Sequence, residues 1–223
     1  MGKFEMYVGC MYSGKTERLR DRIHRERFHF EHTEENPTVL LFKPAIDIRY
    51  GLATDVISHN GTKTPCIPVH STAELADLVA RHKDIRVVGI DEIQFLDHLI
   101  IDWCVYVLRH TPLHVIAGGL NTDFRGEPFR FRDSERTMGE LMSYAQVQTL
   151  SAFCAYRFPE TNTRCPEQAF FTQRLKPNGE PAPYLDPLVH VGGKHDLHER
   201  RYEARCAQHH FVPGRNDHPV TFK

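Results

Sequence analysis

"GCMYSGKTE", at residues 9–17, fits the pattern G-x-x-x-x-G-K-[ST] in full. That pattern binds phosphates where a strand precedes it and a helix follows. Both flanks agree here, because KFEMYV (residues 3–8) is a short extended stretch and TERLRDRIHRERF (residues 16–28) has apolar side chains at helical spacing. The order of strand, loop and helix therefore predicts a phosphate-binding loop after the first strand of an α/β sheet.

The chemistry of such a loop depends on its residue types. Glycines allow backbone amides to turn toward phosphate oxygens, and the helix N-terminus adds a positive dipole end. We expect Lys15 to reach the outer phosphates and the Thr16 hydroxyl to bind Mg²⁺. A glycine turn with an incidental lysine is the alternative interpretation. The predicted nucleotide-binding loop consists of Gly9, Cys10, Met11, Tyr12, Ser13, Gly14, Lys15 and Thr16.

Strands and helices continue to alternate beyond this loop. Apolar, β-branched runs typical of strands in a parallel sheet lie at residues 37–45, 85–92 and 112–120. Predicted helices lie at residues 71–82 and 97–110, and Ser71 with Glu74 forms a capping box at the first of them. The alternation predicts right-handed crossovers and a ligand site at the carboxyl ends of the strands.

Composition limits the class of protein. The chain has 223 residues, with 28 Lys and Arg against 29 Asp and Glu and a net charge of -1. It therefore lacks the basic excess of a general nucleic-acid binder, and we expect no nucleic-acid partner. No apolar run approaches the roughly 20 residues of a membrane span, and no secretory leader is evident. We expect a cytoplasmic protein without a membrane partner.

A change in composition after about residue 150 predicts a second unit. Residues 1–150 are expected to form the nucleotide-binding domain. Residues 151–212 are rich in Pro, Asn and Cys with only short apolar runs, so we expect a loop-built unit held by a metal. Residues 213–223 are expected to be a frayed tail.

Two acids end the predicted strand at residues 85–92. An Asp at the end of an apolar strand beside a phosphate loop is a common second holder of Mg²⁺, and Asp91 is the candidate. Glu92 then lies where an acceptor hydroxyl or a hydrolytic water would be deprotonated. That placement fits a transferase and an ATPase equally. The alternative is that both acids cap the following turn.

The segments GCMYSGKT, DEIQFL (residues 91–96) and GLNTDFRGEPF (residues 119–129) together resemble the type II thymidine kinases. FFTQRL (residues 170–175), VGG (residues 191–193) and RYEARCAQHH extend the resemblance to about residue 212. It implies an α/β fold of the P-loop NTPase, RecA-like type, with helices on both faces of a parallel sheet and a small C-terminal zinc-binding lasso domain. It also implies ATP, Mg²⁺ and structural Zn²⁺.

The resemblance also implies roles for the charged residues. Glu92 would be the general base for the 5′-hydroxyl of thymidine, and Asp91 would serve the metal. Asp47 and Arg49 match a D-x-R motif whose Arg steadies phosphate charge, although a salt bridge within the loop would explain them too. Gln94 is placed with the nucleotide-binding residues.

The same family binds its nucleobase with apolar and aromatic side chains and with backbone groups. For Leu120, Phe124 and Phe129, ordinary core packing is the alternative. The resemblance places Thr172 at the thymine methyl group. The implied nucleoside-binding residues are Met11, Leu120, Phe124, Phe129, Thr172, Val191, Gly192, Gly193 and Tyr202.

The family binds zinc with two pairs of ligands. Cys206 and His209 form a clear C-x-x-H pair, with His210 as an alternative ligand. Cys154 and Cys165 depart from the close family spacing, but an insertion can loop out and return Cys165 to the metal, because coordination constrains only the ligand positions. Three unrelated buried cysteines are the alternative.

Taken together, these features predict ATP-dependent phosphorylation of the 5′-hydroxyl of thymidine, and of deoxyuridine too, for nucleotide salvage. The resemblance implies a homotetramer or dimer and feedback inhibition by thymidine triphosphate. A P-loop ATPase coupled to nucleic acid through a zinc module is the rival hypothesis. A degenerate nucleotide-binding regulator is a third.

Overall fold

The computed structural model describes residues 1–31, 38–45, 55–57, 63–132, 134–188 and 201–215. Six strands form one sheet in the order β5-β2-β6-β7-β1-β8, and all of its pairings are parallel. These strands are β1 (Lys3–Gly9), β2 (Thr38–Pro44), β5 (Ile67–Val69), β6 (Ile85–Ile90), β7 (His114–Gly119) and β8 (Gln146–Leu150). The predicted α/β class is confirmed.

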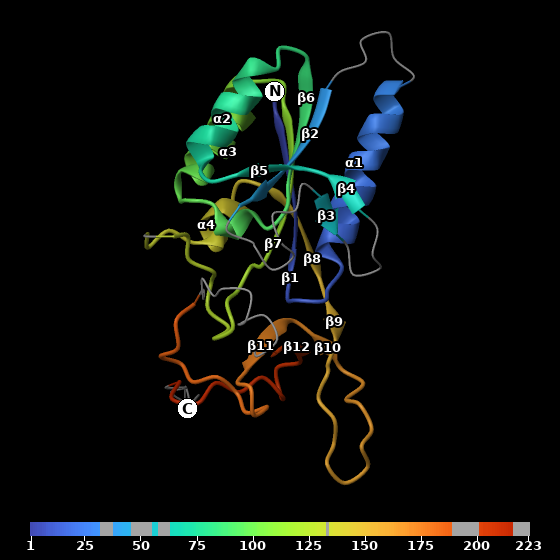
Figure 1. Ribbon diagram of the computed structural model, residues 1–223, viewed down its shortest axis with the longest axis vertical. Helices are drawn as coiled ribbons and strands as arrows, with labels where there is room; N and C mark the ends of the chain where they lie inside the picture. The colour runs from blue at the N-terminus through green and yellow to red at the C-terminus, as the bar shows by residue number, and fades with distance from the viewer. Residues whose placement is uncertain (32–37, 46–54, 58–62, 133, 189–200, 216–223) are drawn as a thin grey trace, which may run out of the picture.

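Helices cover both faces of the sheet (Figure 1). The helix after the phosphate loop, α1 (Lys15–Glu31), packs on one face, and α2 (Thr72–Arg81) and α3 (Leu99–His110) pack on the other. Strand side chains alternate between the two sides. In β1, for example, Tyr7 joins the α1 side, whereas Met6 and Val8 join the core beneath α2 and α3. Two apolar layers therefore clamp the strand that leads into the phosphate loop.

The start of α2 follows its sequence closely. Ser71 is the N-cap, and its hydroxyl accepts a hydrogen bond from the Glu74 amide at 3.2 Å. The Glu74 carboxylate accepts from the amide of His70 at 2.7 Å, one residue before the N-cap. Both predicted capping residues thus form capping hydrogen bonds, but Glu74 bonds to the amide of His70 instead of the amide of the N-cap residue Ser71.

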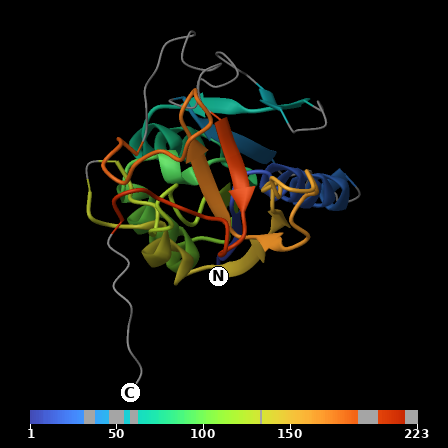
Figure 2. The same cartoon turned by 90° about the horizontal axis from the view of Figure 1, so that it is seen from below.

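The C-terminal part is built from short strand pairs. β9 (Ala152–Phe153) pairs with β10 (Gln168–Ala169), and β11 (Phe171–Leu175) pairs with β12 (Arg201–Arg205), both antiparallel. Figure 2 shows β11 and β12 side by side, in orange and red. These pairs lie beyond the end of the sheet at which β1 turns into α1 (Figure 1).

Several short elements carry little sequence signal. The remaining ones are β3 (Asp55–Ile57), β4 (Lys63–Pro65), a 3-10 turn (Ile93–Phe95) and α4 (Met138–Met142). The edge strand β8 has a largely polar sequence, QVQTL, so its apolar pattern does not distinguish it from a loop. Among the helices that the structure describes, none is long and apolar enough to cross a membrane.

Candidate active site

The phosphate loop closes on the carbonyl oxygen of Cys10. That oxygen accepts from the Ser13 hydroxyl at 2.8 Å and from the Lys15 ammonium at 2.7 Å. Lys15 is buried, so its charge is held within the loop. Gly9 begins the loop with φ +154°, and a Cβ there would clash with the carbonyl oxygen of Leu150 in β8. Only glycine allows β1 and β8 to approach this closely.

The hydroxyl and the carboxylate that were expected to hold Mg²⁺ lie together. Thr16 Oγ1 is 3.3 Å from both carboxylate oxygens of Asp91, across 75 residues of sequence. Asp91 is buried at the carboxyl end of β6, and its amide donates to the carbonyl of Phe42 at 2.9 Å. Hydroxyl and carboxylate oxygens are the ligands that Mg²⁺ prefers, so this donor set fits the metal.

Glu92 leaves the strand in an unusual backbone conformation. Its φ and ψ are 51° and 44°, in the left-handed region that a non-glycine residue adopts at a cost. Its side chain is half-buried. The Gln94 amide donates to its carboxylate at 2.7 Å. The acid is therefore positioned by its own backbone and by a neighbour.

Gln94 connects Glu92 to the next strand. It is only 1% exposed, and its carbonyl oxygen accepts from the Leu120 amide at 3.1 Å. A Cβ on Gly119 would lie 2.5 Å from that oxygen, so glycine at the end of β7 makes room for the side chain. Gln94 thus contacts the predicted base and the start of the predicted nucleoside segment.

The phosphate loop is joined to the C-terminal part. The Met11 amide donates to Thr172 Oγ1 at 3.0 Å, and the Cys10 thiol donates to the Ala169 carbonyl at 3.3 Å. Burial raises the pKa of the Cys10 thiol, although the charge of Lys15 opposes this effect. The thiol therefore stays protonated and acts as a donor. β10 and β11 are thereby brought to the edge of the loop.

The apolar nucleoside-binding candidates divide into two groups. Leu120 and Phe129 are buried in the main core, and Met11 packs against that core. Phe124 belongs to a separate small cluster with Ala182 and Val212. All three of the buried side chains satisfy a core-packing role, so their contact with a nucleobase stays a prediction.

Two further nucleoside-binding candidates share one strand pair. Thr172 lies in β11, and Tyr202 lies in β12 directly opposite Arg174. Side chains two residues apart in a strand, and those directly opposite in an antiparallel pair, point to the same face. Thr172, Arg174 and Tyr202 therefore line one face of the pair.

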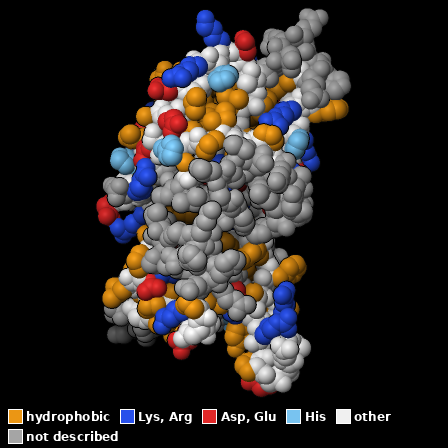
Figure 3. Space-filling model, in the orientation of Figure 1, with side chains coloured by type: hydrophobic (Ala, Val, Ile, Leu, Met, Phe, Trp, Pro, Cys, Tyr) orange, Lys and Arg blue, Asp and Glu red, His pale blue; other side chains and the backbone are white. Residues whose placement is uncertain are grey.

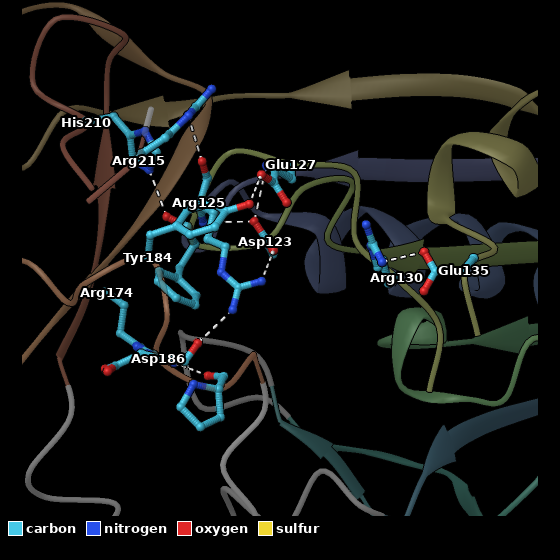
Figure 4. A network of polar contacts seen from close by, with 12 residues as sticks. Asp123, Arg125, Glu127, Arg130, Glu135, Arg174, Tyr184, Asp186, His210 and Arg215 are labelled. Atoms are coloured by element: carbon cyan, nitrogen blue, oxygen red, sulfur yellow. Dashed lines mark hydrogen bonds and ion pairs between the residues drawn. The ribbon is translucent and has the colours of Figure 1, made fainter. Parts of the chain in front are cut away.

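A polar network that contacts Phe124 gathers at the loop after β7, and Figure 4 shows its labelled members. Asp123 accepts from the amides of Arg125 and Glu127 at 2.8 and 3.1 Å, and burial raises the pKa of this carboxyl despite those bonds. The Tyr184 hydroxyl donates to Glu127 at 2.7 Å. That bond to a carboxylate raises the pKa of the Tyr184 hydroxyl. The loop after β7 is thereby joined to the segment around Tyr184.

Network residues also come from the chain end. The Arg215 guanidinium donates to the Arg125 carbonyl at 2.7 Å, so the first residues after position 212 contact the site. Sequence reasoning singled out none of the Asp, Arg and Glu side chains of this network. Two signals could have found it: an arginine within the apolar strand FFTQRL, and a second one inside the GLNTDFRGEPF segment.

The four predicted zinc ligands meet in space. The ligand atoms of Cys154, Cys165, Cys206 and His209 all lie within 4.8 Å of one another. His209 Nδ1 is 3.2 Å from the Cys206 sulfur and 3.7 Å from the Cys154 sulfur. Three thiols and one imidazole are a common tetrahedral set for structural zinc. The sequence-based assignment of the ligands is consistent with this cluster.

The long insertion between the first two ligands folds back on itself. The Cys154 amide donates to the Glu167 carbonyl at 3.0 Å, and the Cys165 amide donates to the Tyr156 carbonyl at 2.9 Å. Residues 154–165 therefore form an excursion that projects from the body in Figure 1 and returns Cys165 to Cys154. Burial opposes a thiolate at Cys154, but hydrogen bonds from backbone amides and from the neighbouring thiols of Cys206 and Cys165 outweigh it and lower the pKa of that thiol.

The two adjacent histidines have different environments. The His209 ring stacks on Tyr156, with centroids 3.9 Å apart and planes at 10°. His210 stacks on Phe171, and its Nε2 is 2.9 Å from the Phe124 carbonyl oxygen. His209 is thus the metal-facing residue, and His210 contacts the network beside Phe124.

Five predicted site residues lie outside the described part of the chain: Asp47, Arg49, Val191, Gly192 and Gly193.

Comparison with known proteins identifies the family. A family model described as thymidine kinase matches residues 2–210. The chain belongs to the thymidine kinase family. A thymidine kinase from Mesoplasma florum is 39% identical over 209 residues, which cover 92% of this chain and 90% of that protein. The type II resemblance is confirmed, and the chain is a kinase of this enzyme class.

Family membership disfavours the rival ATPase that would bind nucleic acid through its zinc module. The face in Figure 3 carries basic and acidic side chains interspersed, without a basic stripe among its described residues. The P-loop and the Cys and His cluster lie in one chain here, and its net charge is only -1.

Proposed function

We propose that the protein transfers the γ-phosphoryl group of ATP to the 5′-hydroxyl of thymidine and releases ADP and thymidine monophosphate. The observation that carries this proposal is the position of Glu92. It follows Asp91 by one residue, Asp91 contacts Thr16 at the phosphate loop, and the Gln94 amide orients the Glu92 carboxylate. A carboxylate held beside a phosphate loop is placed to accept a proton.

Each charged group has one task in this proposal. The loop amides and Lys15 neutralise the outer phosphates, while Thr16 and Asp91 provide the oxygen ligands for Mg²⁺. Mg²⁺, when bound, neutralises the charge that develops on the phosphates. Glu92 takes the proton of the 5′-hydroxyl as the oxygen attacks. Arg49 offsets charge in the loose transition state, as the family resemblance suggests.

The C-terminal part is proposed to close over the nucleoside. An aromatic slot with a few fixed hydrogen bonds suits a flat pyrimidine, and closure excludes the water that would hydrolyse ATP. Zinc at the Cys and His cluster would hold this unit together, because its short strands bury few apolar side chains. Residues 151–212 would then form the substrate-closing unit of the two-domain division.

Finer properties follow from the same proposal. Deoxyuridine lacks only the methyl group of the base and is expected to be a second substrate. We also propose a homotetramer or dimer, inhibition by thymidine triphosphate, a cytoplasmic location and a role in nucleotide salvage. These rest on the family resemblance alone.

The test uses the purified protein with Mg-ATP and labelled thymidine. Thymidine monophosphate should form, and Glu92→Gln should lower kcat by about 100-fold or more while ATP binding stays the same, because only the proton acceptor is removed. Retained turnover in this variant would remove Glu92 as the base. Failure of the unchanged protein to make thymidine monophosphate, with ATP turnover that rises on addition of DNA, would favour the rival function.

A further inference from the structure

Arg174 is the largest fully buried side chain among the described residues, and the proposed mechanism does not use it. It lies in β11 and is only 2% exposed. A buried guanidinium is costly unless all its partners are in place, and buried ion pairs contribute little to stability on average. Its position therefore calls for an explanation other than stability.

The guanidinium of Arg174 contacts an aromatic ring and a loop segment at the same time. Its central carbon lies 3.9 Å from the centroid of the Phe124 ring, which is a close cation–π contact. Its two terminal nitrogens donate to the Pro187 carbonyl at 2.6 Å and to the Asp186 carboxylate at 2.8 Å. One planar group thus joins the ring of Phe124 to the segment at residues 186–187, as Figure 4 shows for Arg174 and Asp186.

Other contacts hold the same two partners. Arg125 donates to the Asp186 carbonyl at 2.7 Å, and His210 Nε2 is 2.9 Å from the Phe124 carbonyl. The segment that contains Asp186 and Pro187 leads within four residues to Val191, the first of the predicted backbone contacts to the base. Two arginines from different parts of the chain, Arg125 and Arg174, therefore hold residues 186–187 in place.

The neighbours of Arg174 are nucleoside-binding candidates. Thr172 lies two residues earlier on the same face of β11, and Tyr202 lies directly opposite in β12. Phe124 lies under the guanidinium. Arg174 thus has three of the side chains expected at the nucleobase as neighbours, and it is itself buried.

We propose that Arg174 is a positioning residue for nucleoside binding. It fixes the plane of the Phe124 ring and anchors residues 186–187, so that the base slot is formed before thymidine arrives. Because a guanidinium can stack on a ring and donate hydrogen bonds to two acceptors at once, lysine cannot replace it. The inference rests on the proposed function and assigns a residue that the mechanism leaves out.

The test compares Arg174→Lys with the unchanged protein in steady-state assays. The KM for thymidine should rise about tenfold, while the KM for ATP and kcat at saturating thymidine change less than about twofold. Asp186→Asn leaves the stacking intact but removes the charged acceptor, and it should raise the thymidine KM by a smaller factor. Arg130→Lys is a matched control, because Arg130 is exposed and pairs with Glu135 in a separate contact (Figure 4).

The outcomes separate this inference from the proposed function. An unchanged thymidine KM in both variants would overturn the role of Arg174. So would an equal rise in the KM for both substrates, because a general loosening of the fold would have that effect. If Arg174→Lys fails to fold, the thymidine KM of Asp186→Asn decides the question. An unchanged protein that does not phosphorylate thymidine would instead refute the proposed function.

Discussion

Replacement of Gln94 by methionine should separate the orientation of Glu92 from the stability of the fold. The two side chains have similar length and volume, so the buried space stays filled. The change removes both hydrogen bonds of the amide, one to the Glu92 carboxylate at 2.7 Å and one from the Leu120 amide at 3.1 Å. Glu92 would keep its charge but lose the hydrogen bond from the Gln94 amide.

The magnitude follows from the two lost bonds. The buried Leu120 amide would be left without a partner, which costs about 1–3 kcal/mol. The half-exposed carboxylate of Glu92 can bind water instead, so the loss of its hydrogen bond lowers the free energy of unfolding by less. For a chain of this length, the thermal midpoint should fall by roughly 5 °C. Misplacement of a catalytic group by about 1 Å can lower a rate up to 100-fold, so kcat should fall on the order of 10- to 100-fold.

Gln173→Met supplies the matched control. Gln173 is also 1% exposed, its carbonyl oxygen accepts from the Phe211 amide at 2.9 Å, and it does not contact Glu92. Thermal unfolding and kcat at saturating thymidine and ATP would be measured for both variants. Similar midpoints with a loss of kcat only in Gln94→Met support the orientation of Glu92 by Gln94. Equal kcat values in the two variants would refute it.

Two further predictions concern the metal cluster and the start of the sheet. By elemental analysis, Cys165→Ser should lose about one bound zinc per chain. Cys104→Ser, which changes another buried cysteine, should retain its zinc. Equal zinc contents in the two variants would contradict the ligand assignment. Burial raises the pKa of Glu5, but a hydrogen bond from Arg22 and the charges of His114 and Arg22 outweigh it and lower the pKa below its ordinary 4.5. Glu5 therefore stabilises the fold above that value, and the stabilisation is lost as the pH falls through its lower folded pKa. Urea unfolding of Glu5→Gln should show a deficit at pH 7 that shrinks below about pH 4, and a deficit independent of pH would argue against this.

Sequence reasoning was most successful where one segment carries its own signal. The loop at residues 9–16, the capping residues of α2 and the long apolar strands β6 and β7 all follow from local pattern. The short or polar strands β5 and β8 carry no such pattern, because edge strands bury little apolar surface and their identity depends on the neighbour with which they pair. The strand pairs β9–β12 were anticipated only as loops for the same reason.

At the site, the residue types were evident and the contacts were not. The family motif indicated Cys154 and Cys165, but only the folded excursion shows that their sulfurs reach the same point. Spacing left His209 and His210 as alternatives, and the position of His209 Nδ1 beside the sulfurs of Cys206 and Cys154 distinguishes them. Arg174 lies in the family segment FFTQRL without an assigned role there, and its importance depends on a ring that lies 50 residues earlier in the chain.

By itself, the sequence determined the phosphate loop, the parallel α/β class, the paired acids and the ligand types, because each is encoded by neighbouring residues with a fixed period or spacing. Tertiary structure alone decided that Thr16 meets Asp91, that Gln94 holds Glu92, and that a buried arginine lies behind Phe124. Such long-range contacts arise from the combined burial of many side chains, and no short stretch of sequence specifies them.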